Sequence, residues 1–118
     1  MALSHLSTSE ILANVGMATG TATSTTADTA ILAAQGATRA IIVGSVSVTN
    51  RSATDTEVDI KDGTTTKDTI SAPANGGAVK RYLWGWPCTA NAALNFATKD
   101  SVDSVVVTAE YRIDAAAS

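Results

Sequence analysis

The sequence predicts an all-β fold, an antiparallel β-sandwich or jelly roll of about seven to eight strands with an extended N-terminal arm. Short alternating or β-branched segments recur with turn signals every 8–12 residues, which is typical of these folds. No long segment has the helical period, and no unit repeats at a fixed spacing, which argues against parallel α/β and solenoid architectures. The 118 residues and 12.0 kDa suffice for a single domain.

The N-terminal part differs in composition from the rest of the chain. Residues 16–29 are almost all Ala, Gly, Ser and Thr, a composition that indicates either an extended arm or an edge strand. Before them, Ser7 and Glu10 have capping-box spacing and Leu6 and Ile11 the spacing of a hydrophobic staple. We therefore expect an arm over residues 1–29, with residues 8–15 forming a short helix or an irregular tail, and a sandwich domain over residues 30–118.

The first half of the predicted sandwich contains three strand segments. Residues 31–32 are a short apolar segment, and residues 39–49 form a long run whose middle, at 41–43, is expected to be buried on both sides. In that run strict alternation places Ile42, Val46 and Val48 on one face and Ile41, Val43, Ser45 and Ser47 on the other. Residues 57–61 alternate most clearly, so Val58 and Ile60 should point inward and the charged residues outward.

The second half continues with turns and strands. Asp62-Gly63 predicts a hairpin turn before a strand at 64–70, and residues 73–77 predict a loop. Residues 79–86 form the next strand, which Pro87 ends because proline cannot donate to a strand ladder. Two further strands are expected at 92–97 and 102–113.

Composition also restricts the function. Charged residues make up 16% of the chain and the net charge is −3, which disfavours nucleic acid as a partner because phosphate binding needs clustered Lys and Arg. No apolar run approaches the ~20 residues of a membrane span, and the N-terminus has no secretion signal. We expect neither nucleic acid nor membrane among the partners.

The residues that commonly carry catalysis are few. His5 is the only histidine, so a zinc site or hydrolytic triad is not expected, and Cys88 has no base nearby and is expected to be buried and inert. Asp55, Glu57, Asp59 and Asp62 cluster in sequence, but Glu57 and Asp59 share an outward strand face that is typical of a solvated surface. We predict no enzyme activity, no catalytic residue, no cofactor and no metal.

Tyr82, Trp84 and Trp86 contain most of the aromatic content of a chain that is only 4% aromatic. At positions i, i+2 and i+4 of a strand they should project from one face. Three roles fit such a stripe: sandwich core, a platform for stacking sugar rings, or a contact with another subunit. The opposite face carries Val79 and Leu83, which could supply the core in its place.

The content of large apolar residues predicts assembly. Leu, Ile, Val and Phe together reach about 20% of the chain, whereas Ala, Ser and Thr make up about two-fifths. Such a core buries limited area, so a monomer would be marginal and a homo-oligomer is expected. The candidate interface residues are Leu6, Ile11, Leu12, Val15, Tyr82, Trp84 and Trp86.

Four segments suggest a family. Residues 58–65 (VDIKDGTT), 73–79 (PANGGAV), 89–97 (TANAALNFA) and 105–111 (VVVTAEY) resemble small β-sandwich structural proteins of tailed bacteriophages. The resemblance covers about the last two-thirds of the chain and concerns turn-and-strand patterns. It implies a capsid decoration or cement protein, a trimer on the outside of the phage head that stabilises contacts between major capsid proteins. Related sandwiches also occur in tails and fibres.

These expectations combine into one functional hypothesis. The chain is expected to be a structural virion protein at the capsid surface, made in the cytoplasm of the host bacterium. Its partners would be sister subunits, with a trimer favoured by the resemblance, and the major capsid protein. The competing hypothesis is a carbohydrate-binding or host-attachment module of a tail or fibre that presents Tyr82, Trp84 and Trp86 to a glycan.

Overall fold

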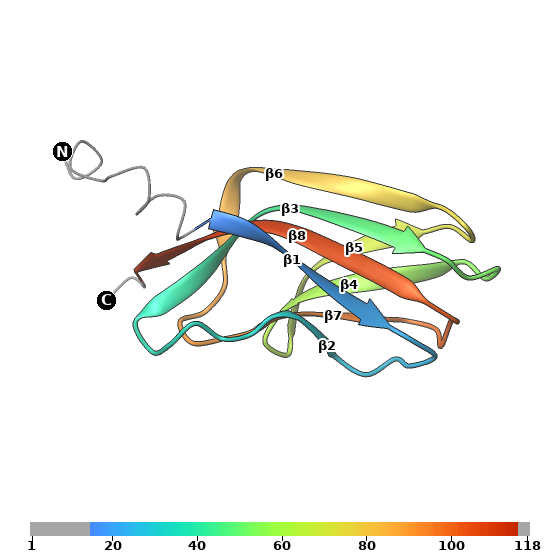
Figure 1. The fold of residues 1–118 in the computed structure, drawn as a ribbon, viewed down its shortest axis with the longest axis horizontal. Coiled ribbons are helices and arrows are strands. Elements are labelled where there is room, and N and C mark those ends of the chain that lie inside the picture. Colours follow the sequence, from blue (N-terminus) through green and yellow to red (C-terminus); the bar gives the residue numbers. More distant parts are fainter. Residues whose placement is uncertain (1–14, 116–118) are drawn as a thin grey trace.

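The computed structural model describes residues 15–115, which form eight strands in two four-stranded sheets (Figure 1). The first sheet has the order β1-β8-β3-β6 and the second β2-β7-β4-β5. The strands are β1 (Val15–Ala22), β2 (Thr29–Leu32), β3 (Arg39–Asn50), β4 (Thr56–Asp62), β5 (Thr65–Ala72), β6 (Gly77–Pro87), β7 (Leu94–Thr98) and β8 (Val105–Ala115). The predicted all-β sandwich is confirmed.

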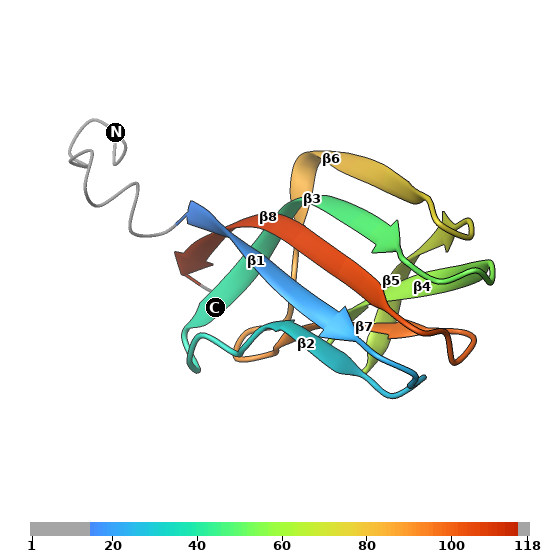
Figure 2. The ribbon, with the colours of Figure 1, turned by 45° about the vertical axis from the view of Figure 1, so that its right-hand side comes forward.

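The strand pairing identifies the sandwich as a jelly roll, a choice that the sequence left open. Every pairing is antiparallel, and β1 pairs with β8, β2 with β7, β3 with β6 and β4 with β5. These pairs are those of one long antiparallel hairpin with its turn between β4 and β5, folded over to form two sheets. Every connection except β4–β5 passes from one sheet to the other. Figure 2 shows the two layers, with β1 lying over β2.

Residues 15–22 adopt the edge-strand alternative that the sequence allowed for the segment after residue 16. They pair along their whole length with β8, from Val15 opposite Arg112 to Ala22 opposite Val105. The sandwich thus includes part of the segment 1–29 that was predicted to be an arm. The predicted helix over residues 8–15 lies outside the described residues except for Val15, which begins β1.

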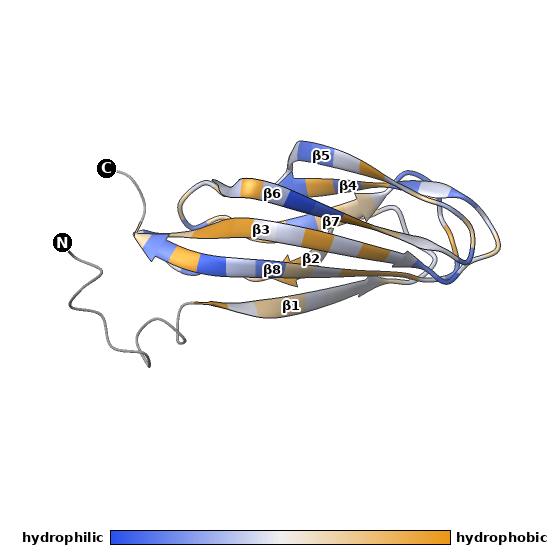
Figure 3. Ribbon diagram, turned by 90° about the horizontal axis from the view of Figure 1, so that it is seen from above, coloured by the Kyte–Doolittle hydropathy of each residue, from blue (hydrophilic) through white to orange (hydrophobic). Residues whose placement is uncertain are grey.

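The core fills the space between the sheets with aliphatic side chains. Val58 and Ile60 are fully buried, as their alternation predicted, and Phe96 is the largest fully buried side chain. Figure 3 shows that apolar and polar residues alternate along several strands. A buried cluster contributed by both sheets holds them together.

A register shift in β3 corrects the predicted assignment of its faces. Ile41 and Val43 point into the core, but so do Val46 and Val48, because the register changes between Val43 and Ser45. The strand pairing thus skips Gly44, an irregularity of the β-bulge kind that reverses the phase of alternation. The prediction that residues 41–43 are buried on both sides is confirmed, with exposures of 0%, 8% and 0%.

The Asp62-Gly63 turn forms the predicted hairpin between β4 and β5. Asp62 pairs with Thr65, which leaves a two-residue loop in which Gly63 has φ +59°. Glycine adopts such positive φ values without steric cost. The loop before β6 also lies where the sequence placed it, and Pro87 is the last residue of β6.

Candidate interaction surface

The most irregular part of the molecule is the second half of β6, which contains the aromatic residues. Val43 of β3 faces Trp86 and the next paired residue, Ser45, faces Arg81. Residues 82–85 therefore lie opposite Gly44 alone and leave the line of the strand, and Figure 1 shows the resulting bend. Gly85 has φ +74°, and a Cβ there would lie 2.8 Å from Ile42 Cγ2. Only glycine fits this turn without displacing its neighbour.

Tyr82 and Trp86 pack inward from this bend. Their rings meet edge to face, with centroids 5.9 Å apart and planes at 83°, and both pack against the core while remaining half-buried. Edge-to-face packing is the favoured geometry of aromatic pairs. The core alternative is therefore the one that the structure favours for these two residues.

The phenol of Tyr82 connects the two sheets. Its hydroxyl donates to Asp68 Oδ2 on β5 at 2.8 Å, and Lys80 Nζ lies 2.7 Å from the same oxygen. Burial raises the pKa of Asp68, but the bonds from Lys80 and Tyr82 outweigh it and lower this pKa below 3.8. Burial and the Asp68 charge raise the pKa of Tyr82, so its hydroxyl stays protonated and donating.

Trp84 points away from its two aromatic neighbours. Trp84 is 83% exposed and the adjacent Leu83 is 88% exposed. The bend thus separates the predicted stripe into an inward pair and an outward Trp84, so the three rings do not share one face. Val79, which the sequence allowed as an alternative core residue, is 66% exposed, and so that alternative is wrong for both Val79 and Leu83.

The opposite edge of the same sheet carries the other exposed large apolar side chains of residues 15–115. Val15 is 43% exposed and Met17 is 67% exposed, both on β1. Val15 is the only member of the predicted N-terminal interface set that the structure describes. Leu6, Ile11 and Leu12 lie outside the described residues. The sequence analysis missed Met17, although alternation from Val15 places both on one face.

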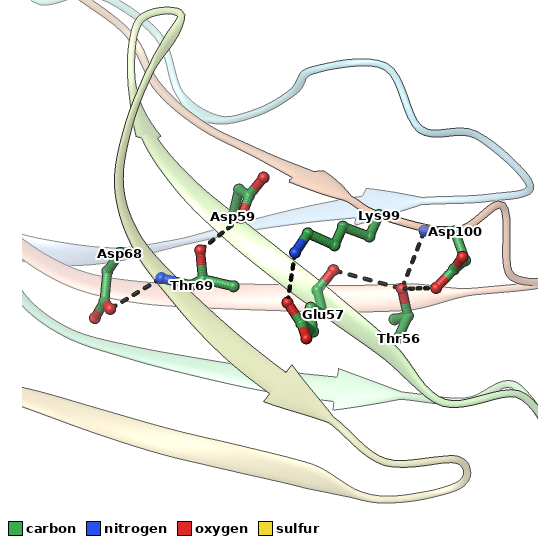
Figure 4. A network of polar contacts seen from close by, with 7 residues as sticks. All are labelled: Thr56, Glu57, Asp59, Asp68, Thr69, Lys99 and Asp100. Carbon is green, nitrogen blue, oxygen red and sulfur yellow. Dashed lines mark hydrogen bonds and ion pairs between the residues drawn. The ribbon is translucent and has the colours of Figure 1, made fainter.

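An open groove of about 520 Å³ lies on the second sheet and contains several acidic residues. It is lined by Asp55, Thr56, Glu57, Ser71, Ala72, Pro73, Lys99 and Asp100. Figure 4 shows two contacts within this lining: Lys99 Nζ lies 2.8 Å from Glu57 Oε2, and Thr56 Oγ1 donates to Asp100 Oδ2 at 3.3 Å. Beside the groove, Thr69 Oγ1 donates to Asp59 Oδ1 at 2.7 Å. Glu57 and Asp59 thus lie on the outer face, as their alternation with Val58 and Ile60 predicted.

No group of His, Cys, Asp and Glu in residues 15–115 is arranged to hold a metal ion. Asp62 lies apart from the groove, buried, where both carboxylate oxygens accept hydrogen bonds from Thr89. Cys88 is 3% exposed, which confirms the predicted burial, and burial with the nearby Asp62 charge raises its pKa to about 12. The thiolate needed for nucleophilic chemistry is therefore scarce at neutral pH.

The part of the chain that the structure describes contains no helix with the length and hydropathy of a membrane span.

Comparisons with known proteins extend the structural result. No protein-family model matches the sequence, and no curated protein matches it. Among solved structures, a chain in the acid-stable capsid of Helicobacter pylori bacteriophage KHP30 is similar, with TM-score 0.55 and 14% identity over 84% of this chain and 87% of that one. A virus-like particle of Macrobrachium rosenbergii extra small virus, from the giant freshwater prawn, matches with TM-score 0.47 and 14% identity over 84% of this chain and 75% of that one.

The bacteriophage match supports the fold. It extends over most of both chains, which are consequently of similar length.

Proposed function

We propose that this chain is a structural protein of a virus particle, and specifically a capsid decoration or cement protein of a bacteriophage. It binds the outside of the head as a homo-oligomer, with a trimer favoured, and stabilises contacts between major capsid proteins. The observation that carries the proposal is the jelly roll itself, which covers the described chain and has a counterpart of similar length in a phage capsid.

The distribution of side chains supports a role in binding other proteins. The core of residues 15–115 is closed between the two sheets, while large apolar side chains remain exposed along β1 and β6. Neighbouring exposed apolar side chains, such as Leu83 and Trp84 on β6, commonly mark protein contacts. The groove on the second sheet contains the Lys99–Glu57 ion pair, and none of the exposed large apolar side chains of β1 and β6 lines it.

The glycan-binding alternative has less support. It requires Tyr82, Trp84 and Trp86 to form one exposed platform, whereas Tyr82 and Trp86 pack against the core. Trp84 alone offers a single ring for stacking. We therefore keep the structural role as the proposed function and non-enzymatic assembly as its mechanism.

The direct test uses phage heads assembled without this chain, from the genome that encodes it. Purified protein is added and the heads are sedimented. Saturable co-sedimentation, together with a higher temperature of head disruption, is expected. Co-sedimentation with tails alone would place the protein elsewhere in the particle, and binding to neither would contradict the proposal. Titration with a panel of bacterial surface glycans tests the alternative in parallel, with tryptophan fluorescence as the readout and a Trp86→Phe variant to assign the signal to Trp84.

A further inference from the structure

Among residues 15–115, all exposed large apolar side chains lie on the two edge strands of one sheet. β1 carries Val15 and Met17, and β6 carries Val79, Leu83 and Trp84. Within residues 15–115 each of these strands has a sheet partner on one side only, β8 for β1 and β3 for β6. An edge strand that is both unpaired and apolar is a template for contact with another chain.

The two exposed sets lie at the same level of the sheet. Gly16 pairs with Tyr111, Tyr111 with Val43, and Val43 with Trp86, so one row of residues crosses from β1 to β6. Three strand spacings separate these edges, about 14 Å at ~4.8 Å each. Val15 and Met17 flank Gly16 at one end of this row, and Leu83 and Trp84 lie close before Trp86 at the other end.

Charge distinguishes the two edges. Glu110 of β8 lies opposite Met17 in the strand register, and Arg81 is two residues before Leu83 in β6. Both side chains are exposed, and neither takes part in the ion pairs formed within residues 15–115. Glu110 belongs to β8, the neighbour of β1, and within one subunit it and Arg81 lie on either side of Ser45 in the strand register. Arg112 of β8 lies opposite Val15, but it pairs with Asp114. The charge without an ion-pair partner is therefore a carboxylate next to the apolar residues of β1 and a guanidinium on β6.

From this placement we infer that the β6 edge of one copy docks on the β1 edge of the next copy. Leu83 and Trp84 of one subunit pack on Val15 and Met17 of its neighbour, and Arg81 faces the neighbour's Glu110. The contact is heterologous, because two different edges meet, and repetition around an axis closes a ring. The inference rests on the proposed homo-oligomer and names its interface, but it does not depend on attachment to a head.

The opposite alternative is an isologous dimer, β6 on β6. It would bring two Arg81 side chains and no carboxylate into the contact, and would leave Val15 and Met17 exposed. Charge and apolar complementarity both favour the heterologous contact.

Two variants, each blocking one edge, test the inference. Met17→Glu blocks the β1 edge and Trp84→Glu the β6 edge, and the high exposure of both residues leaves the fold intact, which circular dichroism and thermal unfolding verify. Light scattering coupled to size exclusion should give a ring for the unmodified full chain and a monomer for each variant. Arg51→Glu, at an exposed site just after the end of β3, is the matched control and should keep the ring.

Mixing the two variants gives the decisive result. Each retains one intact edge, so an equimolar mixture should form a one-to-one dimer that cannot close. If Met17→Glu keeps the oligomer, or if the mixture stays monomeric although each variant is folded, the heterologous interface is wrong. An unmodified chain that is monomeric at high micromolar concentration also overturns it, whereas head binding by that monomer would leave the virion role in place.

Charge reversal provides an independent check. Arg81→Glu and Glu110→Arg should each weaken assembly by about two- to fivefold, the range expected of an exposed ion pair. The double variant should restore it, because the pair is re-formed with opposite signs. Additive weakening in the double variant would show that these two residues do not face each other.

Discussion

Asn50 shows how one buried polar side chain fixes a region of the chain. It is 1% exposed, its Nδ2 donates to the carbonyls of Thr54 and Ala72 at 2.8 and 3.0 Å, and its Oδ1 accepts from the Ser52 amide at 2.9 Å. The side chain thereby holds the β3–β4 turn against the end of β5. The sequence places Asn50 just after the predicted strand at 39–49 and gives no sign of its burial, because that burial depends on strands distant in sequence.

Replacing Asn50 with Ala should lower the free energy of unfolding by about 2–3 kcal/mol, since buried backbone groups would lose their partners. Denaturant unfolding measures this loss. Thr49→Ala, at the neighbouring exposed position, serves as the control and should change stability little. Equal effects of the two substitutions would mean that the Asn50 hydrogen bonds add nothing.

Asp68 predicts how stability depends on pH. Its folded pKa lies below the ordinary value of 3.8, so its charged form stabilises the fold. That contribution is present above the unfolded pKa and is lost as pH falls from about 5 through the folded pKa. The stability gap between the unmodified protein and Asp68→Asn should therefore be constant near neutral pH and shrink in acid. Unfolding measured from pH 7 to pH 2.5 tests this, and a constant gap would contradict it.

At the scale of elements, the sequence predicted the strands better than their faces. The alternation of residues 57–61 and the Asp62-Gly63 turn are local signals, and both were confirmed. The faces of β3 and β6 depend on irregularities at Gly44 and Gly85, which arise where the two strands pair. Because of these irregularities Trp84 does not share a face with Tyr82 and Trp86. Local periodicity cannot predict this, since it does not show how two strands pair.

The two glycines of this irregular region should respond differently to substitution. Gly85→Ala places a Cβ 2.8 Å from Ile42 Cγ2 at φ +74° and should cost about 1–3 kcal/mol of stability. At Gly44 the nearest atom to an added Cβ is the Glu110 carbonyl oxygen at 3.5 Å, so Gly44→Ala should change stability by no more than about 0.5 kcal/mol. Thermal and denaturant unfolding of both variants measure the difference. Equal costs would mean that the bend does not require glycine.

At the scale of the whole molecule, composition pointed to assembly, and the structure specifies where the apolar surface lies. The low content of large apolar residues predicted a core that needs partners. In the described residues the two sheets nevertheless enclose a continuous core, and the large side chains left exposed lie on β1 and β6. The exposed large apolar side chains of residues 15–115 thus lie at the edges of one sheet. Sequence patterns alone did not place Met17, Val79 and Leu83 there.

The proposed place of the chain on the outer surface of a virus particle is tested most directly by cryo-electron microscopy. A difference map is calculated between phage particles assembled with and without this chain. We expect added density on the outside of the head, at positions where major capsid proteins meet, into which the jelly roll of residues 15–115 fits. Identical maps of the head, or added density only inside the shell or on the tail, would contradict it.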